Sequence, residues 1–80
     1  MKIQLLAFGI ARDLLNASSI ELEVPNGSTV LNFKAFLANQ FPSISSIQSF
    51  AIAVNEEYAQ DSLIIQEKDV IAIIPPVSGG

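Results

Sequence analysis

Cysteine and histidine are both missing from this sequence of 80 residues. Their absence excludes disulfide bonds, Cys/His metal sites, a thiolate nucleophile and an imidazole base. Eight acidic residues remain, but no two of them stand in a pattern typical of a catalytic acid–base pair. We therefore expect no metal site and no independent enzyme activity. Any chemistry is expected at a chain terminus or within the site of a partner.

Basic residues are scarce as well. The four that exist, Lys2, Arg12, Lys34 and Lys68, are scattered along a chain whose formal net charge is −4. They cannot form the positive stripe that follows a phosphate backbone, so we expect no nucleic-acid partner. An acidic surface instead suits a partner protein with a basic face.

Long hydrophobic runs are also lacking, and none is long enough to span a bilayer. Lys2 and the apolar residues 3–11 resemble a short signal peptide, but Gln4 and Gly9 interrupt the run. Removing this segment would take the first strand from a small core. We therefore interpret it as a strand and expect a cytoplasmic protein without a membrane partner.

Half of the residues are hydrophobic, which favours a folded domain. A period of two residues predicts strands and a period near 3.6 predicts helices. The predicted strands are 2–8, 19–24, 50–54 and 70–74, with a short one near Tyr58, and the predicted helices are 10–15 and 30–40. Ser28 or Thr29 would cap the longer helix.

Two loops complete the predicted core. The loop 60–69 is expected to tuck Leu63, Ile64 and Ile65 inward, and the polar loop 43–49 to be pinned by Ile44 and Ile47. One main helix can cover only one face of a sheet. The compact solution packs this helix across a mixed sheet whose first and last strands lie side by side at the centre. The sequence thus predicts an α+β fold of the β-grasp (ubiquitin-like) type over residues 1–76.

The first and last strands are apolar on both faces. With the helix covering one face, the other face should carry an apolar patch near the end of the last strand. Exposed apolar patches of more than a few hundred Å² usually mark an interface. The alternatives are that loops fold over this patch, or that the strands are short and tilted.

The chain ends in a segment suited to entering a narrow channel. Pro75 and Pro76 stop strand pairing and hold the chain extended. Gly79 and Gly80 carry no Cβ and form a thin tip, and residues 77–80 are expected to be a flexible tail. A frayed end that happens to finish in glycine is the alternative.

Several of these residues carry a family resemblance. They are Phe8, Ala11-Arg12-Asp13-Leu14, Val54-Asn55, Leu63, Asp69-Val70 and the ending Pro75-Pro76-Val77-Ser78-Gly79-Gly80. With them the chain resembles the small subunits of molybdopterin synthase, a family of ubiquitin-like sulfur carriers. Two positions depart from the family pattern: Ile73-Ile74 stands where aromatic residues are frequent, and Lys68 replaces a frequent turn glycine.

The resemblance implies that Gly80 carries sulfur. A terminal carboxylate is ionised at neutral pH and is a poor electrophile, so the family uses a ubiquitin-activating-like adenylyltransferase and ATP to adenylate it. A persulfide sulfur donor then displaces AMP and leaves a thiocarboxylate. The molybdopterin synthase large subunit, with two copies of each subunit in the assembly, would supply the catalytic side chains that pass this sulfur to cyclic pyranopterin monophosphate. No cofactor would be bound permanently.

The resemblance also implies partner contacts. Phe8, Tyr58 and Ile74 match the apolar contact patch of the family, and Arg12 matches an arginine near that interface. The residues that would lead Gly79 and Gly80 into the partner are Pro75, Pro76, Val77 and Ser78. The alternatives are ordinary core positions for Phe8 and Ile74 and a solvated charge for Arg12.

Other functions stay open on the sequence alone. Sulfur carriers for thiamine or tRNA thiolation also end in Gly-Gly on a β-grasp. A ubiquitin-like protein modifier would join Gly80 to a lysine of another protein. A plain binding module would use the sheet and leave the tail inert.

Overall fold

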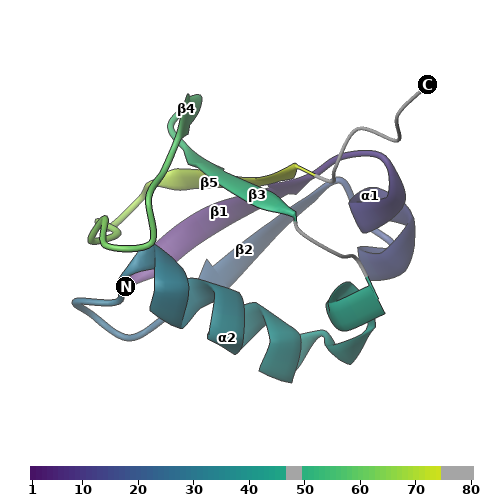
Figure 1. Cartoon of the computed structure of the whole chain (residues 1–80), viewed down its shortest axis with the longest axis horizontal. Coiled ribbons are helices and arrows are strands. Elements are labelled where there is room, and N and C mark those ends of the chain that lie inside the picture. Colours follow the sequence, from purple (N-terminus) through teal and green to yellow (C-terminus); the bar gives the residue numbers. More distant parts are fainter. Residues whose placement is uncertain (47–49, 75–80) are drawn as a thin grey trace.

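The computed structural model describes residues 1–46 and 50–74. Its five-stranded sheet has the order β2-β1-β5-β3-β4. The elements are β1 (Lys2–Ala7), α1 (Ile10–Leu15), β2 (Ser19–Glu23), α2 (Val30–Gln40), the 3-10 helix η1 (Pro42–Ser46), β3 (Ala51–Val54), β4 (Glu57–Tyr58) and β5 (Val70–Ile74). Helix α2 lies across one face of the sheet (Figure 1), which confirms the predicted β-grasp architecture.

The first and last strands form the centre of the sheet, as predicted. β1 pairs in parallel with β5 and antiparallel with β2, and β3 runs antiparallel to both β5 and β4. A central strand pairs on both edges and is apolar on both faces when both are covered. Here only one face is covered by α2, so the apolar side chains on the other face need a separate explanation.

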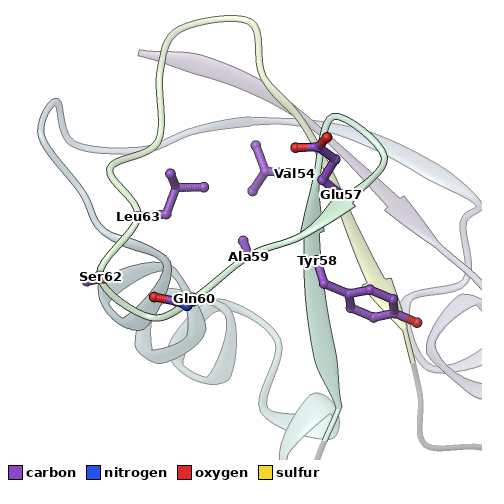
Figure 2. A pocket seen from close by; sticks show the side chains of 7 residues that line it. All are labelled: Val54, Glu57, Tyr58, Ala59, Gln60, Ser62 and Leu63. Atoms are coloured by element: carbon purple, nitrogen blue, oxygen red, sulfur yellow. The ribbon is translucent and has the colours of Figure 1, made fainter.

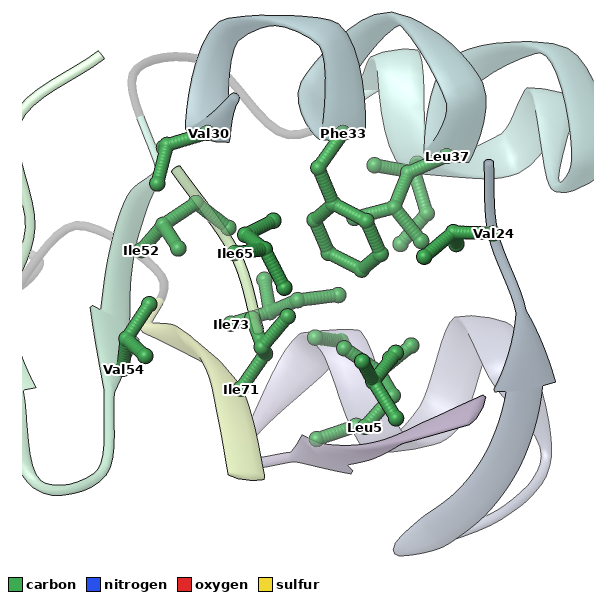
Figure 3. Packing of buried hydrophobic residues seen from close by; sticks show 14 residues of the cluster. Leu5, Val24, Val30, Phe33, Leu37, Ile52, Val54, Ile65, Ile71 and Ile73 are labelled. Carbon is green, nitrogen blue, oxygen red and sulfur yellow. The ribbon is translucent and has the colours of Figure 1, made fainter. Parts of the chain in front are cut away.

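Side chains from the covered face of the sheet meet one stripe of α2 and form the core (Figure 3). Val30, Phe33 and Leu37 recur at helical spacing along that stripe. The hydrophobic effect of removing this layer from water is the main favourable term in folding. The largest fully buried side chains are Phe33, Ile3, Leu5, Leu37, Ile44, Ile65, Ile71, Ile73 and Val30.

Thr29, one of the two predicted caps, begins α2 with a capping box. Its hydroxyl accepts a hydrogen bond from the backbone N–H of Asn32 at 3.2 Å, and its own N–H donates to the Asn32 side chain at 3.1 Å. Ser28 instead donates its hydroxyl to the carbonyl of Pro25 at 2.7 Å. The two bonds of the capping box satisfy backbone N–H groups that a helix start otherwise leaves unpaired.

Replacing the cap should weaken the fold by a measurable amount. We expect Thr29→Ala to lower the free energy of unfolding by about 1 kcal/mol, because the N–H of Asn32 loses its acceptor. Urea denaturation followed by circular dichroism measures this change. Thr29→Ser is the matched control, since it keeps the hydroxyl and should lose much less. Equal stability of Thr29→Ala and the wild type would contradict the role of the cap.

The loop before β5 differs from the prediction. Ile65 is buried, but Leu63 is 43% and Ile64 53% exposed. The backbone of Ile64 forms an isolated antiparallel bridge with Thr29, and the N–H of Ile65 donates to the carbonyl of Ser28. An extended segment places consecutive side chains on opposite sides. Ile64 and Ile65 therefore cannot both face the core. Leu63 lines a hollow on the surface, which is described below.

Smaller differences concern element ends. Phe8, Val24 and Phe50, predicted as strand ends, fall just outside β1, β2 and β3. The predicted polar loop after α2 contains η1, in which Ile44 is fully buried as expected; Ile47 lies outside the described residues. None of the described helices is both long and apolar enough to cross a membrane.

Candidate functional site

The sheet face opposite α2 carries a row of apolar side chains across four strands. The register pairs Leu6 with Ala72, Ala72 with Ala53, and Ala53 with Tyr58. Residues paired across neighbouring strands lie on the same face of a sheet. The row therefore has two alanines in its middle and a large side chain at each end, which leaves its middle lower than its ends.

This row forms the floor and walls of an open groove of about 290 Å³. We call it the outer groove, and it is lined by Leu6, Phe8, Ala53, Glu56, Tyr58, Val70, Ala72 and Ile74. Phe8 is 51% and Tyr58 76% exposed. The apolar patch predicted near the end of the last strand is thus present and open to solvent.

Three of the predicted partner contacts meet in the outer groove. Phe8 follows β1, Tyr58 ends β4 and Ile74 ends β5, so they come from distant parts of the sequence. β1 and β5 are parallel, which brings Phe8 and Ile74 to the same end of the sheet. That these residues contact a partner stays a prediction. Because Phe8 and Ile74 line a surface groove, the alternative that they are ordinary core residues is wrong.

Arg12, the fourth predicted contact, lies on α1 rather than in the lining of the outer groove. Its neighbour Ala11 is buried while Arg12 is exposed. Among residues 1–46 and 50–74, the ion pairs use Met1, Lys2 and Lys34 as cations and leave the guanidinium of Arg12 unpaired. α1 follows β1 at the end of the sheet where β5 also ends (Figure 1), but Arg12 is not among the residues that line the groove.

The predicted tail residues Pro75, Pro76, Val77, Ser78, Gly79 and Gly80 lie outside the described residues. The residue to which the tail is attached, Ile74, is among the described residues. β5 ends at Ile74, which lines the outer groove. The chain therefore passes into the tail directly from the groove.

A second hollow of about 350 Å³ lies beside β4 and the loop that follows it (Figure 2). Its lining mixes polar and apolar residues: Val54, Glu57, Tyr58, Ala59, Gln60, Ser62 and Leu63. The ring of Tyr58 points away from the other lining side chains (Figure 2). We take the outer groove as the candidate site because it is more uniformly apolar and lies where the tail begins.

A hydrogen-bonded clasp supports the edge of the outer groove. The side-chain carbonyl of Asn55 accepts from the N–H of Val70 at 3.0 Å, and its amide donates to the carboxylate of Asp69, also at 3.0 Å. The N–H of Asn55 donates to the carbonyl of Val70 at 2.7 Å. Residues 54–55 and 69–70 carried part of the family resemblance, and the structure joins them at one place.

Lys68, one of the two departures from the family pattern, lies in the turn next to this clasp. Its φ is 69°, in the left-handed region that glycine occupies without steric penalty. A glycine, which the family resemblance leads us to expect at this position, would adopt this conformation without strain. The N–H of Lys68 donates a hydrogen bond to the carbonyl of Lys2 at 2.7 Å, and this bond stabilises the turn.

Sequence reasoning missed some lining residues. It identified the apolar strands but did not single out Ala53, Ala72 or Glu56. The only signal for the alanines was their alternate position in apolar strands. Within the described residues, no three acidic side chains gather closely enough to hold a metal ion.

Comparisons with known proteins agree with this architecture. The model of the ThiS family matches residues 5–80. The molybdopterin synthase sulfur carrier subunit of Arabidopsis thaliana is 42% identical to this chain over 81 residues, which cover 100% of this chain and 84% of that protein.

Two solved structures share the fold. The putative molybdopterin converting factor subunit 1 from Pyrococcus furiosus has a TM-score of 0.87 at 22% identity, over 96% of this chain and 99% of that one. A chain in the complex of subunits 1 and 2 of the molybdopterin-converting factor from Helicobacter pylori has a TM-score of 0.69 at 21% identity, over 100% of both chains. The family match spans nearly the whole sequence, and this chain belongs to the ThiS family of β-grasp proteins.

Proposed function

We propose that this chain is the sulfur carrier subunit of a molybdopterin synthase. Two observations support the proposal. The Arabidopsis thaliana protein that bears this name is similar over the full length of the chain, and the family match runs to Gly80. The chain would supply the sulfur-bearing terminus, and a large subunit would supply the catalytic side chains.

The single observation that carries the mechanism is the position of the outer groove at the end of β5. A partner that covers Phe8, Tyr58 and Ile74 would lie beside the first residue of the tail. The six residues from Pro75 to Gly80 reach about 20 Å when extended. A partner bound at the groove could therefore receive Gly80 in a pocket within that distance.

The chemistry at Gly80 would proceed in three steps. The carboxylate attacks the α-phosphorus of ATP in the activating enzyme, pyrophosphate leaves, and an acyl adenylate forms. The terminal sulfur of a persulfide donor attacks the acyl carbon and AMP leaves. The product is an acyl disulfide that keeps the sulfur–sulfur bond of the donor. A thiol then attacks the donor sulfur of that bond, which releases the donor as a mixed disulfide and leaves a thiocarboxylate on Gly80.

The large subunit would then bind the charged tail and transfer the sulfur to cyclic pyranopterin monophosphate. The thiocarboxylate is an anion, and basic groups in the partner's pocket would stabilise it through charge-assisted hydrogen bonds. We propose that Arg12, exposed on α1, adds a charged contact at the edge of the same interface. The Helicobacter pylori structure is a complex of subunits 1 and 2, which supports a large-subunit partner. The cytoplasmic location stays a prediction.

The experiment that tests the proposal is an intact-mass measurement. The purified chain is incubated with the activating enzyme, ATP, a persulfide donor and a thiol. We expect a mass gain equal to the exchange of one oxygen for one sulfur, and we expect the loaded chain to form molybdopterin when a large subunit and the pterin precursor are added.

Other outcomes separate the alternatives. A mass gain without molybdopterin formation would point to a carrier for thiamine or tRNA thiolation. An isopeptide-linked adduct in the presence of lysate would point to a protein modifier. An unchanged mass with partners shown to act on a known carrier would overturn the proposal.

A further inference from the structure

The turn between β3 and β4 holds a residue that its geometry does not favour. The loop has two residues, Asn55 and Glu56, with φ values of 52° and 74°. Positive φ at both positions is the condition of a type I′ turn, in which Asn followed by Gly is the preferred pair. Asn55 fits this pattern. Glu56 occupies the position where a side chain beyond glycine is strained.

Within the part of the chain that the structure describes, the Glu56 carboxylate takes part in no stabilising contact of the fold. Among the described residues, the ion pairs and side-chain hydrogen bonds do not include it. Glu56 is exposed, so burial does not hold it in place either. A strained residue without a structural role is a reason to look for a functional one.

Glu56 occupies a distinctive place on the open sheet face. It is the charged member of the lining of the outer groove, whose other lining residues are all uncharged. It also lines an adjoining hollow of about 310 Å³ with Leu6, Asn55 and Val70. The two hollows share Leu6, Glu56 and Val70, so a partner that covers this face would surround Glu56 with apolar surface.

Several hydrogen bonds hold the backbone next to Glu56. Asn55 is tied to Val70 by two hydrogen bonds and to Asp69 by a third, and Asp69 accepts from the N–H of Gln66 at 2.8 Å. These bonds connect the hairpin turn to the start of a central strand. The carboxylate is thereby carried on a backbone whose position is determined before any partner binds, which lowers the entropy lost on binding.

We propose that Glu56 is a specificity-determining residue of the interface with the large subunit, where it pairs with an arginine or lysine that the partner presents beside an apolar side chain. This inference rests on the proposed function. Covering the groove removes water from the carboxylate, and an unpaired charge left there is costly. Partners without a matching basic group are therefore rejected, and the correct one gains a charge-assisted hydrogen bond.

The test uses two variants of Glu56 and one matched control in the full chain. Glu56→Gln removes the charge but keeps the size and the backbone strain. Glu56→Gly removes the side chain and relieves the strain. Glu57→Gln is the control, because Glu57 is the neighbouring exposed glutamate and lines the second hollow instead (Figure 2).

We expect Glu56→Gln to bind the large subunit about tenfold or more weakly than the wild type, with an unchanged melting temperature. Glu56→Gly should bind as weakly, yet melt about 4 °C higher, because the strain is relieved. Glu57→Gln should bind like the wild type. Isothermal titration calorimetry with the large subunit and thermal unfolding measure these quantities.

The outcomes separate this inference from the function on which it rests. If the wild-type chain does not bind the large subunit, both fail. If the wild type binds and Glu56→Gln binds equally well, the role of Glu56 is refuted and the proposed function stands. A lower melting temperature for Glu56→Gly would also refute the inference, since it would show that the side chain serves the fold.

Discussion

Removing Gly80, or adding one residue after it, is expected to abolish sulfur transfer while leaving the fold as stable as before. The reacting group in the proposed mechanism is the terminal carboxyl of Gly80. One extra residue moves that group by about 3.5 Å, and misplacement of reacting groups by 1 Å can lower a rate about a hundredfold. The described residues end at Ile74, one residue after the last core side chain, Ile73, so neither change removes a buried contact of the described core.

Molybdopterin formation by the reconstituted synthase measures the first part of this prediction, and the melting temperature measures the second. Binding to the large subunit serves as the internal control. The shortened chain keeps the whole outer groove and should still compete with the wild type for the partner. Sulfur transfer that survives either change would exclude the tip from the mechanism.

Replacing either of two neighbouring residues of β5, Ile73 or Ile74, with aspartate should have different effects: one variant should lose its fold and the other its affinity for the partner. Ile73 is fully buried beneath α2, whereas Ile74 lies on the other face and lines the outer groove. Ile73→Asp would bury an unpaired carboxylate at a cost of several kcal/mol, against a stability of about 4–12 kcal/mol for a domain of this length. We expect that variant to be largely unfolded. Ile74→Asp should stay folded but bind the large subunit at least about tenfold more weakly.

Circular dichroism and thermal unfolding distinguish the two variants before any binding is measured. Ile74→Val is the control for the groove, since it keeps an apolar side chain and removes only one methylene. A folded Ile74→Asp variant with wild-type affinity would show that the partner does not cover this face. A stable Ile73→Asp variant would contradict the assignment of the two faces.

Local patterns in the sequence were sufficient for most of the secondary structure. The predicted bounds of α1, α2 and β5 agree with the structure, because each element has a clear period or a clear stop such as Pro42. The predicted ends of β1, β2 and β3 differ from those in the structure by one residue. Phe8 was expected in the first strand, but Gly9 with its φ of 54° ends the extended backbone close by.

The candidate site could be predicted only in part. Phe8, Tyr58 and Ile74 were named from the family resemblance, and the structure brings all three to one groove. Arg12 was named on the same ground and lies outside the lining. Glu56 was not named, because its importance depends on the backbone conformation of a two-residue turn.

The error at Leu63 and Ile64 has a clear physical reason. Both residues are as hydrophobic as Ile65, so composition alone could not rank the three. Their exposure is decided by the backbone bridge between Ile64 and Thr29, a contact between residues far apart in the chain.

The sequence by itself determined the elements, the helix cap region and the exclusion of Cys- and His-dependent chemistry, because these depend on residue types and short spacings. The tertiary structure alone decided the row Leu6, Ala72, Ala53 and Tyr58 and the clasp at Asn55. Both depend on strand register, which is set by pairing between distant segments and by the side of the sheet that α2 covers. That register brings apolar residues from distant parts of the sequence together in one groove, which lies where the tail begins.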